Sequence, residues 1–204
     1  MLNRITRRLT RKPRFHYLQV MYKPLQGNLP DYRAAIPCQL VELPPNVECV
    51  EKTLAHLPHK HRPDVAKRIN SGQICYVGKH NNQVIYAVWL ATGTCYSYLL
   101  DRTFKLAPDE LYSYGAYTLP QFRGKRVHPD MVCQRLKISQ AKGYRHNIGF
   151  FEPNNTAALK MPKQLGYQYA GVVGMFEIFG IRAYFSLVRN TLRADDRRFF
   201  LQKV

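Results

Sequence analysis

The feature that most constrains this chain is a strand, a basic turn and a helix in succession over residues 110–141. The segment 110–119, ELYSYGAYTL, has the aromatic and apolar content of a strand. The turn QFRGKRVHPD follows with one glycine and several basic residues, and a helix is expected over 129–141. Backbone N–H groups at a strand-to-helix turn point outward together, and the helix dipole adds positive charge. The turn is therefore suited to bind a pyrophosphate.

The rest of the chain also alternates between strand and helix patterns. Two short helices are expected over 47–57 and 63–69, with Gly72 as a C-terminal cap, and a further helix over 155–166. Strands are expected at 15–25, 36–43, 73–79, 84–91, 145–152, 167–180 and 181–189, with 94–100 extending the sheet. Hairpins imply antiparallel neighbours and helical crossovers imply parallel ones. The pattern predicts an α+β fold with a mixed sheet.

Charge and cysteine content narrow the class of protein. The 204 residues carry a net charge of +18, which attracts an anionic partner or forms a solubilising surface. The length suits one domain, and no apolar run is long enough to span a membrane. The five cysteines are widely spaced without a CxxC pair, which favours free thiols in a reducing compartment. We therefore expect a cytoplasmic protein.

The N-terminal residues are strongly basic. Residues 1–14 contain no acid, and Leu2, Ile5 and Leu9 recur at helical spacing between the basic side chains Arg4, Arg7, Arg8, Arg11, Lys12 and Arg14. Such a segment can lie on an anionic membrane as an amphipathic helix. It can equally be a frayed tail or a docking arm for nucleic acid. No apolar core of a secretory signal is present in it.

Two segments carry a resemblance to a known family. The segment 118–128, TLPQFRGKRVH, resembles motif A of the GNAT acetyltransferases, which are acetyl-CoA-dependent N-acetyltransferases; Pro120, Phe122, Arg123 and Gly124 match its pattern in register. The segment NTAAL, which begins at Asn155, and the later LGY are similar to motif B of that family in composition and spacing. The order of elements over 36–190 is similar as well.

The resemblance implies a fold and a division of the chain. It implies a GNAT fold, with a mixed central sheet of about six to seven strands, a splayed pair of parallel strands and about four flanking helices. Residues 1–34 would form a basic arm with the first extended segment. Residues 35–190 would form the acyltransferase domain, and 191–204 a C-terminal tail.

The resemblance also implies a co-substrate and the residues that hold it. The co-substrate would be acetyl-CoA, another acyl-CoA or the thioester of an acyl carrier protein. The residues implied in its binding are Tyr117, Thr118, Leu119, Arg123, Gly124, Lys125, Arg126, Val127, His128, Asn155 and Ala158. No metal is expected, because His56, His59 and His61 lack an accompanying cysteine or carboxylate cluster.

Three positions depart from the family pattern. Arg126 and His128 stand where the family usually has glycines, which permit close approach of the backbone to phosphate. Pro162 stands where many members carry the tyrosine that protonates the departing thiolate. Another acid, or none, would then serve here, and Pro162 also interrupts the expected helix.

Acyl transfer to an amine needs a base that removes a proton from the amine and an acid that supplies a proton to the leaving thiolate. Glu110 opens the strand before the basic turn, where several relatives place a general base, and Glu152 at the end of the next strand is its rival. Several tyrosines fall near the expected site, and we take Tyr114 as the candidate proton donor.

Two functions remain open from the sequence. The first is transfer of an acyl group to the amine of an anionic acceptor. The second is a non-catalytic module on the same scaffold that binds an anionic lipid surface, nucleic acid or an acidic protein. Nucleic-acid binding has no supporting motif, since the aromatic residues fall in strands at core spacing. The closing β-pair is apolar enough either to bury an edge in a homodimer or to form a monomer's core.

Overall fold

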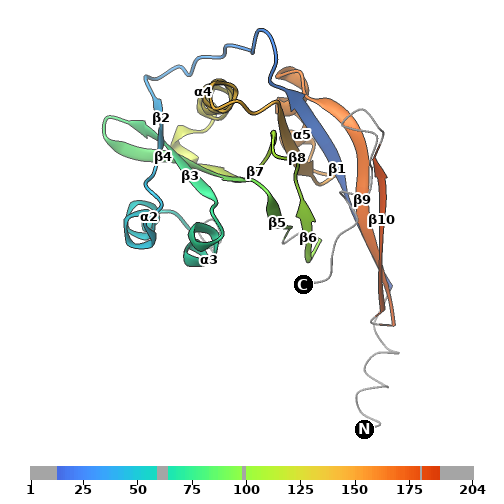
Figure 1. Cartoon of the computed structure of the whole chain (residues 1–204). Helices are drawn as coiled ribbons and strands as arrows, with labels where there is room; N and C mark the ends of the chain where they lie inside the picture. Colours follow the sequence, from blue (N-terminus) through green and yellow to red (C-terminus); the bar gives the residue numbers. More distant parts are fainter. Residues whose placement is uncertain (1–12, 59–63, 98–99, 180, 189–204) are drawn as a thin grey trace.

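The computed structural model describes residues 13–58, 64–97, 100–179 and 181–188. Within them the main sheet has eight strands in the order β10-β9-β1-β8-β7-β4-β3-β2 (Figure 1). These strands are β1 (Arg14–Pro24), β2 (Gln39–Glu42), β3 (Ile74–His80), β4 (Gln83–Ala91), β7 (Glu110–Thr118), β8 (His146–Phe151), β9 (Gln168–Ile178) and β10 (Ile181–Val188). A separate two-stranded sheet contains β5 (Thr94–Ser97) and β6 (Arg102–Lys105).

The helices cover both faces of the main sheet. α4 (Val127–Ala141) and α5 (Thr156–Gln164) lie on one face, where Met131 packs against Tyr86 and Leu111. α2 (Val47–Leu54) and α3 (Val65–Asn70) lie on the other, where Val50 and Val65 share a core with strand residues such as Trp89. Strand side chains alternate between the two faces, which explains these separate clusters. Figure 1 shows α4 across the sheet from α2 and α3.

β7 and β8 are parallel, while the other recorded strand pairs are antiparallel. The crossover between β7 and β8 contains α4, and the crossover from β8 to β9 contains α5. β3 and β4 form the expected hairpin, whose turn residues Asn81 and Asn82 have positive φ angles. The mixed α+β sheet with its parallel pair is thus confirmed.

The strand count exceeds the expected six to seven because of β1. This strand lies between β8 and β9 and is antiparallel to both. Residues 14–24, expected beside the basic arm, are therefore part of the central sheet. The expected extension of the sheet by 94–100 is wrong, because β5 pairs with β6 outside the main sheet. Residues 98 and 99 lie outside the described ranges, as does most of the basic arm.

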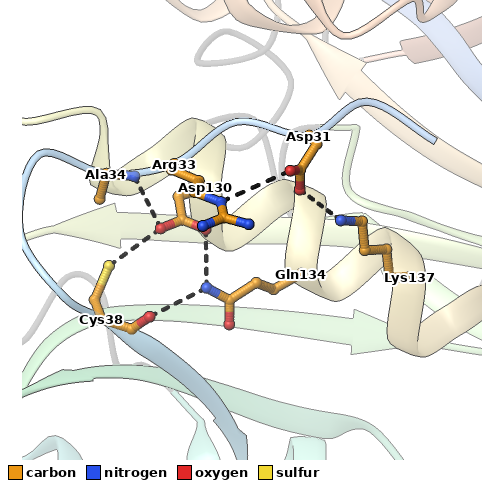
Figure 2. A network of polar contacts seen from close by, with 7 residues as sticks. All are labelled: Asp31, Arg33, Ala34, Cys38, Asp130, Gln134 and Lys137. Atoms are coloured by element: carbon orange, nitrogen blue, oxygen red, sulfur yellow. Dashed lines mark hydrogen bonds and ion pairs between the residues drawn. The ribbon is translucent and has the colours of Figure 1, made fainter.

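A polar network ties the connection between β1 and β2 to α4. Figure 2 shows Asp130 of α4 between the backbone of Ala34 and the side chains of Cys38 and Gln134. The Asp130 carboxylate accepts the Ala34 N–H at 3.0 Å, the Cys38 thiol at 3.4 Å and the Gln134 amide at 2.8 Å. These bonds satisfy a buried carboxylate and hold the segment against the helix.

No helix among the described residues is long and apolar enough to cross a membrane.

Candidate active site

The parallel strands β7 and β8 separate soon after they meet. Their pairing covers Glu110–Tyr112 of β7, with Tyr112 opposite Ile148 at its end. β7 continues to Thr118 along β4, where the register shifts between Ala87 and Trp89. Gly115 lies in this irregular stretch at φ +65°, a conformation that glycine adopts at low cost. The result is a gap with the backbone of β7 along one side.

A cavity of about 480 Å³ occupies this gap and reaches both faces of the sheet. Its walls come from β7 and β8, from α3 and β5 on one face, and from α4 and α5 on the other. The lining residues are Arg68, Val88, Tyr96, Ser97, Tyr112, Ser113, Tyr114, Gly115, Ala116, His128, Val132, Arg135, Asn147, Gly149, Phe150, Phe151, Ala158, Met161, Pro162 and Tyr167. A volume of this order suits a small ligand or part of a larger one.

The cavity is electropositive. It contains two buried arginines, Arg68 with 5% of its surface exposed and Arg135 with 3%. None of its described lining residues is an aspartate or a glutamate. A buried guanidinium is costly to desolvate, and an anion at hydrogen-bonding distance offsets that cost. The cavity therefore favours a ligand that carries negative charge.

On the α4 side, a chain of polar groups joins the two separating strands. Arg135 donates to the Tyr167 hydroxyl at 3.4 Å, and Tyr167 donates to Asn147 Oδ1 at 2.6 Å. Asn147 then donates to Ser113 Oγ at 2.5 Å. Burial raises the pKa of Tyr167, so its hydroxyl stays protonated at neutral pH. The Arg135 Nε has no recorded partner.

On the opposite face, aromatic rings surround Arg68. Its guanidinium carbon lies 5.0 Å from the centre of the Trp89 ring and 4.9 Å from that of Tyr114. Tyr114 also stacks on Tyr112, with ring centres 5.1 Å apart, and its hydroxyl donates to Gln73 Oε1. Cation–π contacts and stacking hold these side chains in fixed positions. Tyr114, the candidate proton donor, is thus at the cavity wall.

The basic turn leads from β7 into the N-terminus of α4. Gly124 has φ +76° and Arg126 has φ +57°, so the arginine adopts the left-handed conformation that the family's glycine would adopt more easily. The first turn of α4 has no side-chain cap, so the N–H groups of Val127 and His128 are the candidates to donate to an anion. Arg123 donates from Nε to the Thr118 carbonyl at 3.1 Å and lies over Tyr117.

His128, in the first turn of α4, also lines the cavity. Burial, with a smaller contribution from the positive charge of Arg135, lowers the pKa of His128 to about 4. The imidazole is therefore neutral at pH 7. Its ring centre lies 5.6 Å from that of Tyr86, whose own pKa is raised to about 12 by burial.

The remaining residues expected to bind the co-substrate lie in the core, in the basic turn and at the start of α5. Tyr117, Leu119 and Val127 are buried in the core, so only their backbone could meet a ligand, while the Lys125 ammonium lies 5.3 Å from the Phe122 ring centre. Asn155 caps α5 by accepting the Ala158 N–H at 3.0 Å. The cap places Ala158 on the cavity wall, where Pro162 follows one turn later.

Neither candidate carboxylate lies in the cavity. Glu110 is buried at the paired end of β7, where its carboxylate accepts the Ala107 N–H at 2.8 Å. Glu152 is exposed just beyond β8. Because β7 and β8 diverge away from Glu110, the strand itself separates this carboxylate from the gap.

Sequence reasoning missed several polar residues of the cavity, among them Arg68, Arg135 and Asn147. Each arginine stands in a helix among other polar residues, where a solvent-exposed position is the ordinary interpretation. Asn147 stands in a strand whose following residues, 148–151, contain no polar side chain. A polar residue in an apolar strand is the one available indication of a buried hydrogen-bond network.

Of the comparisons with known proteins, only the one with solved structures gives matches, and these concern the fold. No family model matches the sequence, and no curated protein matches it. A GCN5-related N-acetyltransferase from Sphaerobacter thermophilus is similar in structure, with a TM-score of 0.58 and 10% identity over 90% of this chain and 56% of that one. A GCN5-related N-acetyltransferase from Kribbella flavida has a TM-score of 0.50 and 10% identity, covering 93% of this chain and 63% of that one.

A third similar structure is the IAA acetyltransferase from Bacillus cereus, with a TM-score of 0.51 and 13% identity over 72% of this chain and 93% of that one. This chain spans about half to two thirds of the first two proteins and most of the third. At these identities the likeness concerns the arrangement of the backbone. The chain has the GNAT fold.

Proposed function

We propose that the chain is an N-acyltransferase that moves an acetyl or longer acyl group directly from acyl-CoA to the amine of an anionic acceptor. The observation that carries the proposal is the gap between β7 and β8, which opens into a cavity beside the uncapped start of α4. The structural neighbours named above are acetyltransferases, which is consistent with this chemistry.

The co-substrate would lie along the open side of β7. The amides of a pantetheine arm would pair with the edge of β7 that leaves β8 beyond Tyr112, and the arm would then act as an added strand. The pyrophosphate would meet the N–H groups of the turn from Gly124 to His128, where the helix dipole and nearby basic side chains attract it. The acyl group would enter the cavity near Ala158.

The acceptor would enter from the face of α3 and β5. Arg68 is fixed there between Trp89 and Tyr114, and its positive charge suits a carboxylate or phosphate on the acceptor. A polyamine would meet two arginines and no described carboxylate in the cavity. These charges support an amine acceptor that also carries an acidic group.

In the reaction, the neutral amine nitrogen attacks the thioester carbonyl carbon, a C–N bond forms and the C–S bond breaks. The nitrogen then loses its proton to water. Water is proposed as the base because the described lining residues include no carboxylate. The leaving thiolate takes up a proton. Tyr114 is proposed as its donor from one face of the gap, and Tyr167 is the alternative from the other.

Binding of the co-substrate tests the first part of the proposal. Acetyl-CoA binding is measured by calorimetry on the whole chain and on Ala158→Phe, which places a ring in the cavity. Thr156→Phe is the matched control, since it adds the same ring at an exposed position of α5. We expect binding that moderate salt does not abolish and that only Ala158→Phe weakens, by about tenfold or more. Equal effects of the two variants, or no binding, would contradict the proposal.

The acceptor class is tested with a panel of amines that differ in charge. Amines bearing a carboxylate or phosphate should be acylated faster than polyamines of similar size, and Arg68→Gln should raise KM for them by about tenfold. Arg33→Gln, at a side chain with 89% exposure, removes the same charge outside the lining of the cavity. A preference for polyamines, or equal KM changes in both variants, would rule out the anionic acceptor while leaving the acyltransferase intact.

A further inference from the structure

One face of the β1-β9-β10 end of the sheet is apolar and exposed. The registers align Phe15 with Phe176, and Ile178 with Ile181, so these side chains share a face with Leu187. Their exposed fractions range from 45% for Phe176 to 75% for Ile181. We call these five residues the hairpin face. Soluble proteins rarely leave so many large apolar side chains together in water, so such a face marks an interaction site.

The opposite face of the same strands is already occupied. Glu177 is buried between Arg14 and Arg182 in the strand register, and Arg182 also pairs with Asp101 next to β6. The Arg102 guanidinium carbon lies 3.9 Å from the ring centre of Tyr184. Because side chains alternate along a strand, packing on this side leaves the hairpin face turned away from the small β5–β6 sheet.

The hairpin face adjoins the most basic part of the sequence. β1 begins at Arg14, opposite Glu177 near the end of β9, so residues 1–12 attach to the sheet at this end. Those twelve residues contain five basic side chains and no acid. Phe179, 51% exposed, adds a further aromatic side chain in the turn after β9. In the sequence, the large apolar side chains of this end of the sheet therefore follow directly on a strongly basic segment.

We propose that the hairpin face binds the surface of an anionic lipid bilayer, to which the net charge of +18 of the chain is complementary. Aromatic and branched side chains at the boundary of headgroups and acyl chains gain hydrophobic free energy, and nearby Lys and Arg are attracted to anionic lipid. A second copy of the chain would also cover the apolar face. It would, however, bring together two basic segments of two molecules with a net charge of +18 each, which repel one another.

Cosedimentation with vesicles tests this surface. The full chain is mixed with vesicles of phosphatidylcholine alone, and with vesicles of phosphatidylcholine and phosphatidylglycerol. We expect binding to the anionic vesicles only. The variant Phe176→Thr/Ile181→Thr, which keeps strand-forming residues, should weaken it by at least about tenfold. Replacing Arg4, Arg7 and Arg8 with glutamine should weaken it as well, with a smaller dependence on salt.

Tyr169→Thr is the matched control, because Tyr169 is 53% exposed but lies near the other end of β9. It should bind the anionic vesicles as the wild type does. Equal losses in this control and in the double variant would overturn the proposed surface. So would binding that ignores Phe176 and Ile181, because basic residues alone would then account for it.

A tryptophan at the hairpin face separates insertion from association of two copies. Ile181→Trp adds a reporter to Trp89, which is fully buried and gives a constant background. Its emission should shift to shorter wavelength with anionic vesicles and remain that of an exposed indole without them. A blue shift without vesicles, accompanied by a dimeric mass in solution, would overturn the bilayer in favour of a second copy. Acyltransferase activity does not enter these measurements, so the result is independent of the proposed function.

Discussion

Asn147 of β8 donates a hydrogen bond of 2.5 Å to the Ser113 hydroxyl of β7, next to the point where the two strands stop pairing. The backbone ladder between the strands ends at Tyr112 and Ile148, and this side-chain bond spans the start of the gap. Asn147 is fully buried and also accepts the Tyr167 hydroxyl. The start of the gap is therefore defined by a buried polar network.

Removal of this amide should destabilise the protein. We expect Asn147→Ala to lower the free energy of unfolding by about 1–3 kcal/mol, because Tyr167 and Ser113 lose a buried partner. Ser113→Ala is the control, since it removes only the Asn147–Ser113 bond, at a half-buried position, and keeps the Tyr167–Asn147 bond. Chemical denaturation followed by circular dichroism measures both. A larger loss in Ser113→Ala would show that Tyr167 does not depend on Asn147.

The stability of the chain should depend on pH through His128. Its pKa is about 4 in the folded chain and 6.5 in the unfolded one, so the unfolded chain binds the proton first on acidification. The contribution of His128 to stability is present above pH 6.5 and is lost as the pH falls towards 4. Wild type should lose up to about 3 kcal/mol more than His128→Gln over this interval. Parallel stability curves for the two proteins would contradict the neutral, half-buried imidazole.

Substitution by alanine should reduce the stability of the chain much more at Gly171 than at Gly93. A Cβ at Gly171 would lie 2.0 Å from the Leu187 carbonyl oxygen, and its φ is +145°. Gly171→Ala should therefore destabilise the chain by about 3 kcal/mol or more, because the β9–β10 pairing must shift. A Cβ at Gly93, with φ +64°, meets no atom within 4 Å, so Gly93→Ala should cost about 1 kcal/mol. Thermal unfolding of the two variants gives the comparison, and similar losses would contradict the close approach.

The thiol of Cys38 should react slowly with alkylating reagents. Burial and the hydrogen bond to Asp130 raise the pKa of Cys38 to about 12, which leaves little thiolate at pH 8. Asp130→Asn removes the negative charge and should speed labelling of Cys38, which peptide mass spectrometry would detect. Gln134→Ala, which removes another member of the network, is the control. Unchanged labelling in Asp130→Asn would show that burial alone protects the thiol.

Most elements could be predicted from local pattern because each depends on nearby residues. The apolar run 84–91, the Asn-containing hairpin turn and the helix after Asn155 are properties of short segments, and the structure contains each of them. The parallel pair β7 and β8 followed from the helical crossover between them. The small β5–β6 sheet escaped prediction, since the sequence does not reveal which partner a short strand will choose.

Only those parts of the candidate site that lie in contiguous motifs could be predicted from the sequence. The basic turn and Asn155 belong to contiguous motifs, while Arg68, Arg135 and Asn147 meet only after three distant segments fold together. Glu110 lies outside the cavity because it is at the end of β7 that stays paired with β8. The register of the two strands decides which end of β7 is paired. Tyr114 lies on the cavity wall because the strand beyond Tyr112 leaves β8.

The sequence by itself determined the α+β class, the order of the elements and the resemblance of two motifs to GNAT acetyltransferases, since these depend on periodicity, turn residues and spacing. Only the tertiary structure decided that β1 is inserted between β8 and β9, because that pairing joins residues more than a hundred positions apart. It also decided that two arginines are buried in one cavity, and that large apolar side chains of β1, β9 and β10 are exposed on one face of the sheet. Local propensity carries no information about such contacts, which depend on how distant surfaces pack.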